Sequence, residues 1–207
     1  MCSGSPHTWI VSSQLLTDVN ELPQTAAASF ALWAPRLHSY YQTQLASLYN
    51  HPMHAHLYKH RNFFRSVFPC CTINLGGQVC CYKHRDVLNC PFGWCAITAL
   101  GKFDAARGGH LILWDLKLVI NFPAGATVLI PSATLVHSNT PVAVDESRLS
   151  FTQYCAGPIL RFVDQGFRTE KVLRTEDPEM YQSFQASKPN RWQQGMALFS
   201  RMEELIE

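Results

Sequence analysis

No stretch of this sequence is long and apolar enough to predict a membrane span. The richest apolar segment, His110–Phe122, is interrupted by Asp115 and Lys117, and a span needs roughly 18 apolar residues. The first five residues, Met1–Ser5, lack the basic start and apolar core of a signal peptide. We therefore expect an intracellular protein without a membrane partner.

The Cys-x-x-Cys motif is also absent, although the chain has eight cysteines. Structural zinc sites usually take ligands separated by two to four residues, and no Cys-x-x-Cys occurs here. A disulfide framework is typical of small secreted chains, which this sequence does not resemble. We therefore predict reduced, partly buried thiols, with a structural zinc site as the less favoured alternative.

Charged residues are scarce, at 15%, whereas 47% of the residues are hydrophobic, which excludes a disordered chain. A chain of 207 residues suits one domain with a sizeable core, so we predict a single domain over residues 1–207. The net charge of +2 permits an anionic partner such as nucleic acid but does not require one.

Helical patterns occupy both ends of the chain. In residues 23–66, apolar side chains recur at three- and four-residue steps, which predicts an amphipathic helical region. Residues 164–207 form a second helical region by the same criterion. The expected elements are a helix over Gln24–Tyr49 broken at Pro35, a strand or loop over Ile159–Val172, and helices over Asp177–Phe184 and Arg191–Leu205.

Residues 70–163 contain eight β-prone segments separated by turns. Strands at such regular spacing, with few helices between them, are typical of a sandwich or jelly roll. We therefore predict an α+β fold with a mainly β core, a double-stranded β-helix (jelly roll, cupin-like) flanked by N- and C-terminal helices. The strand candidates are Cys70–Leu75, Val79–Asp86, Cys95–Leu100, Gly109–Trp114, Leu118–Phe122, Ala126–Pro131, Leu135–Ser138 and Ser147–Cys155.

The tripeptide His84-Arg85-Asp86 contains two potential metal ligands. Residues two apart on an extended segment point to the same side, so both side chains can reach one point in space. His137, in an apolar and strand-like context, supplies a third ligand. Two histidines and one carboxylate are the ligand set of non-haem iron(II) oxygenases. We predict that His84, Asp86 and His137 bind Fe(II); the alternative is a structural sandwich with unrelated polar residues.

Arg148, eleven residues after His137, supplies a cation for an anionic co-substrate. A 2-oxo acid fills two of the three iron positions left open by the protein ligands and leaves one for dioxygen. A guanidinium pairs with the far carboxylate of 2-oxoglutarate through two hydrogen bonds. Ser150 lies on the same strand face and adds a hydroxyl. We therefore predict 2-oxoglutarate and O2 as co-substrates, with Arg148 and Ser150 binding the former.

The segment from Thr72 to Phe162, roughly 90 of the 207 residues, resembles the TET/JBP group of 2-oxoglutarate and iron(II)-dependent dioxygenases, in particular its fungal, transposon-associated branch. The resemblance is carried by CYKHRDVLNCPFGWCAITALGKFD, GGHLILWDL, FPAGATVLIPSATLVHSNTPV and ESRLSFTQY. It implies a double-stranded β-helix and oxidation of methylated bases in DNA. It also assigns the metal to His84, Asp86 and His137, and 2-oxoglutarate to Arg148.

Two asparagines are candidates for substrate contact. In the TET proteins an asparagine five residues after the first metal histidine contacts the flipped methylcytosine, and Asn89 has that spacing from His84. An amide both donates to and accepts from a base edge; the alternative is a turn residue before Cys90. Asn139, two residues after His137, is expected to face the same pocket.

The sequence departs from the animal TET enzymes, because it lacks their long cysteine-rich region and the large insert between strands. DNA would then be held by other parts of the chain. His51–Arg65 mixes basic and aromatic residues, a composition that can bind phosphates and stack on bases, although a solvated helix face has the same composition. Lys59, Arg61 and Arg65 are our candidates for DNA-backbone contacts.

Together these observations predict a dioxygenase that oxidises the methyl group of a modified nucleobase in DNA, first 5-methylcytosine to 5-hydroxymethylcytosine and then to further products. The expected partner is methylated duplex DNA with the target base flipped out, which would place the protein in the nucleus. The alternatives are an N6-methyladenine demethylase acting on DNA or RNA, a protein or small-molecule hydroxylase, and an inactive, DNA-binding, transposon-associated homologue.

Overall fold

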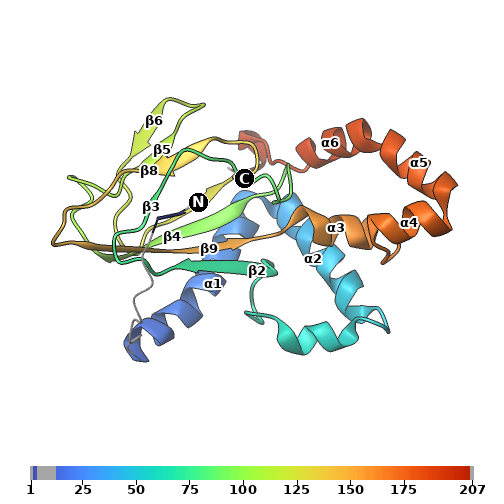
Figure 1. Cartoon of the computed structure of the whole chain (residues 1–207), viewed down its shortest axis with the longest axis horizontal. Coiled ribbons are helices and arrows are strands. Elements are labelled where there is room, and N and C mark those ends of the chain that lie inside the picture. The colour runs from blue at the N-terminus through green and yellow to red at the C-terminus, as the bar shows by residue number, and fades with distance from the viewer. Residues whose placement is uncertain (1, 4–12, 206–207) are drawn as a thin grey trace.

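The computed structural model describes residues 2–3 and 13–205, and this part of the chain contains two main antiparallel sheets, a small two-stranded sheet, and helices packed beside them (Figure 1). The predicted α+β class with a mainly β, jelly-roll core is confirmed. Residues 1, 4–12 and 206–207 lie outside the described residues, and with them most of Met1–Ser5, where we expected no signal peptide. No helix in the described part of the chain is long and apolar enough to cross a membrane.

The larger sheet provides the floor of a cavity between the two main sheets. Its strand order is β2 (Cys70–Asn74), β9 (Ser147–Tyr154), β4 (Cys95–Lys102), β7 (Thr127–Ile130). Each neighbouring pair is antiparallel. Strand β9 lies in the interior of the sheet, hydrogen-bonded along both edges, so its inward side chains are held by two ladders of backbone bonds.

The smaller sheet faces the larger one, and its strand order is β6 (Leu118–Ile120), β5 (Leu111–Leu113), β8 (His137–Asn139). Buried side chains from the two sheets pack together as one core: Cys95, Ala99, Leu111, Leu113, Phe122 and Ile130. Burial of this apolar surface holds the sheets face to face and leaves a cavity at one end.

The strand predicted over Val79–Asp86 is wrong in its extent. Only β3 (Cys80–Cys81) is extended, and it pairs with β1 (Cys2–Ser3). The chain then leaves the sheet and returns to it at His84, through a single bridge to His137. The metal-ligand tripeptide therefore lies on a loop, and strand alternation is not what brings His84 and Asp86 together.

The N-terminal helical region packs on the outer face of the larger sheet. Helices α1 (Ser13–Trp33) and α2 (Pro35–Asn50) meet at the predicted break, since Pro35 occupies the first turn of α2, where a missing N–H costs little. Their buried aromatic and aliphatic side chains contact residues of β4 and β7. After α2 the chain forms the short 3-10 helix η1 (Ala55–His60).

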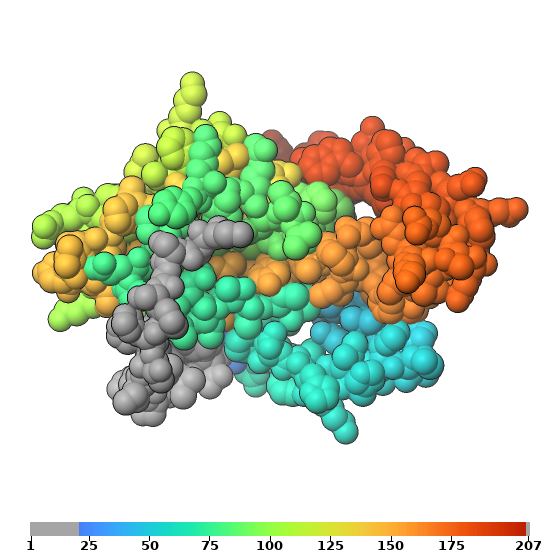
Figure 2. Space-filling model, viewed as in Figure 1, coloured from blue at the N-terminus to red at the C-terminus, as the bar shows by residue number. Residues whose placement is uncertain are grey.

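The C-terminal region contains more helix than the sequence pattern predicted. The strand or loop expected over Ile159–Val172 is wrong: Pro158 begins α3, and the Thr169 hydroxyl caps α4 by accepting from Val172 N. The expected final helix stops early, at Met196, and the Phe199 ring packs at a tilt against Trp94. The elements are α3 (Gly157–Asp164), α4 (Glu170–Glu176), α5 (Pro178–Ala186), α6 (Lys188–Met196) and η2 (Met202–Leu205). Helices α4, α5 and α6 lie at one end of the molecule, in orange and red in Figure 2.

Reduced thiols were expected, and Cys70, Cys71, Cys90, Cys95 and Cys155 are free. Burial raises the pKa of Cys90 and of Cys95 to about 12. These two thiols therefore stay protonated at neutral pH and serve as small apolar side chains.

Candidate active site

A cavity of about 420 Å³ lies between the two sheets, and it contains the predicted metal ligands and the predicted co-substrate residues together. Its floor comes from β2, β4 and β9, and its roof from β5, β8 and the loop after β3. The side chains that reach it from these elements are Thr72, Asn74, Cys81, His84, Arg85, Asp86, Val87, Leu88, Asn89, Ile97, Leu111, Phe122, His137, Ser138, Asn139, Arg148, Ser150, Thr152 and Tyr154.

His84 and His137 are brought together by direct backbone pairing. His84 N donates to His137 O at 3.1 Å, and His137 N donates to His84 O at 3.0 Å. This two-way exchange is the hydrogen-bonded pair of an antiparallel bridge, which places the two side chains side by side. Their ring centroids lie 4.4 Å apart.

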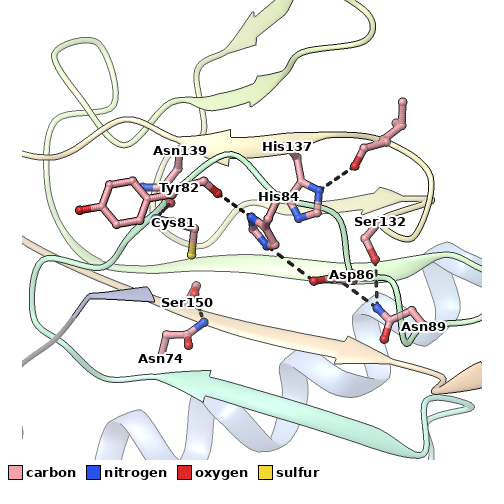
Figure 3. Close-up of polar contacts among 11 residues, drawn as sticks. Asn74, Cys81, Tyr82, His84, Asp86, Asn89, Ser132, His137, Asn139 and Ser150 are labelled. Carbon is pink, nitrogen blue, oxygen red and sulfur yellow. Dashed lines mark hydrogen bonds and ion pairs between the residues drawn. The ribbon is translucent and has the colours of Figure 1, made fainter. Parts of the chain in front are cut away.

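Each imidazole is oriented by a carbonyl of its own segment. His84 Nδ1 lies 2.6 Å from Tyr82 O (Figure 3), and His137 Nδ1 lies 2.9 Å from Leu135 O. A ring nitrogen next to a carbonyl carries the proton, so Nε2 of each ring keeps its lone pair for an ion. Such a contact to the second nitrogen is typical of metal-binding histidines.

Asp86 completes the group, with Oδ1 3.6 Å from His84 Nε2. Its other oxygen, Oδ2, accepts from Asn89 Nδ2 at 3.3 Å (Figure 3), and the backbone Asp86 N donates to Ser132 O at 3.0 Å. Ligand atoms of His84, Asp86 and His137 all lie within 4.8 Å of one another, and in the described part of the chain they are the one such cluster. Two imidazoles and one carboxylate, gathered on one side of a cavity, fit Fe(II) with open positions toward that cavity.

Burial lowers the pKa of His137, and the neighbouring His84 lowers it further, whereas the Leu135 carbonyl and Asp86 oppose the shift. His137 is 5% exposed, so charging it without a partner would be unfavourable. A neutral imidazole is the form that binds a metal, so the environment favours the competent state.

The cavity lining also contains a buried cation and a buried hydroxyl group. Arg148 and Ser150 project from β9 and are 3% and 4% exposed. Arg148 Nη1 donates to Val79 O at 3.1 Å, and Asn74 Nδ2 donates to Ser150 Oγ at 2.9 Å (Figure 3). A guanidinium and a hydroxyl on one strand face fit the distal carboxylate of 2-oxoglutarate, and the candidate Fe(II) donors line the same cavity.

The two asparagines lie at the cavity, but their amides are engaged by the protein. Asn89 Nδ2 donates to Asp86 Oδ2 and, at 3.0 Å, to Ser132 Oγ. Asn139 Nδ2 donates to Val79 O and Thr140 O, while its Oδ1 accepts from Cys81 N. Asn89 therefore holds a metal ligand, and Asn139 joins β3 to β8.

The three basic candidates for DNA contact do not line the cavity. The Arg61 guanidinium lies 4.0 Å from the centroid of the Tyr58 ring and 5.0 Å from that of Phe64. Arg65 donates to Gln24 at 3.4 Å, and Lys59 lies in η1. Arg61 is thus partly used for packing, whereas Lys59 and Arg65 are exposed to solvent.

Sequence reasoning missed several contributors to the site. Asn74 lies opposite Ser150 in the β2–β9 register, and Thr72 lies opposite Thr152, so both pairs contribute to the polar floor. The alternation of Thr72 and Asn74 along a predicted strand was a usable signal. Ser132, which is 1% exposed and hydrogen-bonded to Asn89, lies in a turn and had no such signal.

No family model and no curated protein matches the chain. Among solved structures, the chain is similar to NgTET1 in complex with 5mC DNA, with TM-score 0.39 and 16% identity over 70% of this chain and 55% of that one. It is also similar to the viral collagen prolyl hydroxylase vCPH from Paramecium Bursaria Chlorella virus-1. A truncated form aligns with TM-score 0.31 and 20% identity over 42% of this chain and 54% of that one. The 2OG complex aligns with TM-score 0.31 and 16% identity over 56% and 70%.

The chain thus spans little more than half the length of the first two structures. These likenesses are too weak to assign a substrate, and the argument for function depends on the site's own geometry.

Proposed function

We propose that this protein is an Fe(II)- and 2-oxoglutarate-dependent dioxygenase that oxidises the methyl group of a modified base in DNA, with 5-methylcytosine as the preferred substrate. One observation carries the proposal. The His84–Asp86–His137 cluster and the Arg148–Ser150 pair line one and the same cavity between the sheets. The choice of base comes from the resemblance of the motifs around these residues to TET-like enzymes.

In this proposal the protein's own groups bind and orient the reactants. Nε2 of His84, Nε2 of His137 and Oδ1 of Asp86 hold the metal, while Tyr82 O, Leu135 O and Asn89 fix their orientations. Arg148 and Ser150 anchor the distal carboxylate of 2-oxoglutarate. When bound, Fe(II) would activate dioxygen, with one oxygen atom going to the methyl group as a hydroxyl and the other to 2-oxoglutarate, which is oxidised to succinate and carbon dioxide.

The rim of the cavity suits an apolar, planar group better than a charged one. Val87 and Leu88 line it and are 77% and 73% exposed, and Tyr82, on the same loop, is 67% exposed. Exposed apolar side chains beside a pocket mark a surface that is covered when a partner binds. A base flipped from a duplex offers such a planar face and would bring its methyl group to the metal.

Duplex DNA would then extend beyond the rim, and we propose Lys59 and Arg65 as backbone contacts, with Arg61 holding their segment in place. Each lost phosphate contact should reduce the salt dependence of binding by roughly one unit in the log–log slope. Lys59→Ala and Arg65→Ala should therefore bind duplexes more weakly and with a smaller slope than the native protein. Equal slopes would exclude this surface.

The decisive experiment is mass spectrometry of nucleosides after methylated duplexes are incubated with the protein, Fe(II) and 2-oxoglutarate. Matched duplexes carry 5-methylcytosine, N6-methyladenine or no methyl group, and succinate is measured in parallel. Formation of 5-hydroxymethylcytosine supports the proposal. Loss of N6-methyladenine with release of formaldehyde would instead indicate the demethylase alternative.

If succinate forms without any change in the bases, the substrate class is wrong, and proline-containing peptides are the next panel. If no succinate forms but methylated duplex still binds, the protein is an inactive DNA-binding homologue.

A further inference from the structure

The turn between β5 and β6 contacts both segments that carry the metal ligands. The β5–β6 hairpin projects at the top of Figure 1, and its yellow-green atoms protrude in Figure 2. In this turn, Asp115 Oδ2 accepts from Val136 N at 2.8 Å and lies 3.4 Å from Arg85 Nη2. One carboxylate oxygen therefore bridges two segments about fifty residues apart in the sequence.

The two partners of Asp115 are direct neighbours of the ligands. Arg85 lies between His84 and Asp86 in the chain, and Val136 immediately precedes His137. A shift of either segment would change the separation of the three ligand atoms, because His84 and His137 are otherwise joined by one bridge of two backbone bonds.

Trp114, which directly precedes Asp115 in the turn, also contacts both metal-ligand segments. Its N donates to Val136 O at 2.9 Å, and its indole Nε1 donates to Ser138 Oγ at 2.9 Å. On the loop side, Lys83 Nζ lies 4.6 Å from the centroid of the indole ring. The turn thus holds β8 on one side and the metal-ligand loop on the other, and Asp115 is the charged group in it that contacts both.

The solvent exposure of Asp115 and Arg85 indicates that their contact has a role other than overall stability. The side chains of Arg85 and Asp115 are 48% and 42% exposed, and an exposed ion pair contributes little to folding. The Val136 N–H, and to a smaller extent Arg85, lower the pKa of the Asp115 carboxyl, so it is ionised at neutral pH. Groups that orient metal ligands nonetheless affect metal affinity strongly, by about 10–100-fold when removed.

We propose that Asp115 is a positioning residue for the metal centre, which keeps the His84–Asp86 loop and the His137 strand at the separation required for one ion. This inference depends on the metal site proposed above, but not on the identity of the substrate.

The test is titration with Co(II), whose visible absorption reports both affinity and coordination geometry, performed on folded protein without 2-oxoglutarate. Asp115→Ala removes both contacts and should weaken Co(II) binding about 10-fold. Asp115→Asn keeps an oxygen for Val136 N–H but loses the charge facing Arg85, so it should weaken binding only two- to threefold, by roughly the value of an exposed ion pair. Arg85→Gln should match Asp115→Asn.

Asp145→Ala is the matched control, because Asp145 is an exposed turn aspartate with no side-chain hydrogen bond or ion pair in the described structure. It should bind Co(II) as the native protein does. Melting temperatures of the metal-free variants separate the two roles. If Asp115→Ala melts earlier but binds Co(II) with native affinity and spectrum, Asp115 is merely structural and the proposal is overturned.

Should Asp115→Ala not fold, Asp115→Asn and Arg85→Gln decide the matter, and native Co(II) affinity in both overturns the proposal. Failure of the proposed function can be distinguished from failure of the proposal for Asp115. A native protein that binds Co(II) at this site but oxidises no methylated base refutes the function and leaves the role of Asp115 intact.

Discussion

The two ends of the cavity are built in different ways. At the metal end, His84 and Asp86 lie on a loop with side chains 31% and 30% exposed. At the co-substrate end, Arg148 and Ser150 are buried on an eight-residue strand that is hydrogen-bonded along both edges. The metal end therefore depends on a few individual hydrogen bonds, whereas the co-substrate end is held by sheet ladders.

This difference separates the residues that bind the metal or 2-oxoglutarate from the residues that position those binding groups. Near the metal, carbonyls and amides such as Tyr82 O and Asn89 set the geometry, so substitutions outside the ligand set should alter metal binding. On β9 the backbone sets the geometry, so only the side chains that touch 2-oxoglutarate should matter there. Five predictions test this division.

The largest effect is expected from removing two ligands at once. His84→Ala combined with Asp86→Ala leaves one imidazole, which cannot hold Fe(II) in a defined geometry. Iron-dependent succinate formation should fall to background, while binding of methylated duplex stays largely intact in a mobility-shift assay. Succinate formation by the double variant would refute the assigned metal site.

Arg148→Lys keeps the charge but loses the two-pronged hydrogen bonding to a carboxylate. A charge-assisted bond contributes about 2 kcal/mol, so the KM for 2-oxoglutarate should rise about 30-fold with Co(II) affinity unchanged. Arg107→Lys, at an exposed turn position, is the control and should leave the KM as it is. A lowered Co(II) affinity in Arg148→Lys would contradict the independence of the two ends.

Asn89→Ala tests whether this amide positions Asp86 or contacts the base. Loss of the bond to Asp86 Oδ2 should weaken Co(II) binding about 10-fold, with Asn121→Ala as an exposed control. If positioning is the whole role, saturating Fe(II) restores kcat/KM for methylated DNA. If the rate stays low on methylated DNA at saturating metal, Asn89 contacts the base as the TET resemblance implies.

Ser150→Ala should have a smaller effect than Arg148→Lys. A neutral hydrogen bond contributes about 1 kcal/mol, so the KM for 2-oxoglutarate should rise about fivefold. Asn74→Ala should give a similar or smaller change, because it removes the donor that orients the Ser150 hydroxyl. No change in either KM would place the distal carboxylate elsewhere in the cavity.

The smallest effect is expected on thermal stability when the pH is lowered. Burial lowers the pKa of His137 in the folded, metal-free protein, so the folded state resists protonation that the unfolded state accepts. Stability linked to His137 is therefore complete above pH 6.5 and declines as the pH falls below that value. Thermal melting of the metal-free protein should show this decline, and His137→Gln should weaken it. An equal decline in His137→Gln would assign it to other groups.

Much of the strand pattern could be predicted from the sequence, because the alternation of apolar and polar residues and the turn residues are local features of the chain. The segments around Cys70–Asn74, Cys95–Lys102 and Ser147–Tyr154 were placed within one or two residues of their final bounds. The extended strand over Val79–Asp86 failed because its backbone bonds go to residues far along the chain: His84 to His137, and Asp86 N to Ser132 O. Helix α3 was missed because it has only eight residues and begins with Gly157 and Pro158, two residues that are also typical of loops.

By itself the sequence determined the chemistry of the site: the types of ligand, their order along the chain, and an arginine and a serine on one strand face. Only the tertiary structure decided that Asn89 turns its amide to Asp86, that Asn74 supports Ser150, and that Asp115 bridges the two metal-ligand segments. The physical reason is that donor chemistry belongs to each residue, whereas these contacts depend on register between segments far apart in the chain, set by non-local backbone hydrogen bonds and by burial between the two sheets.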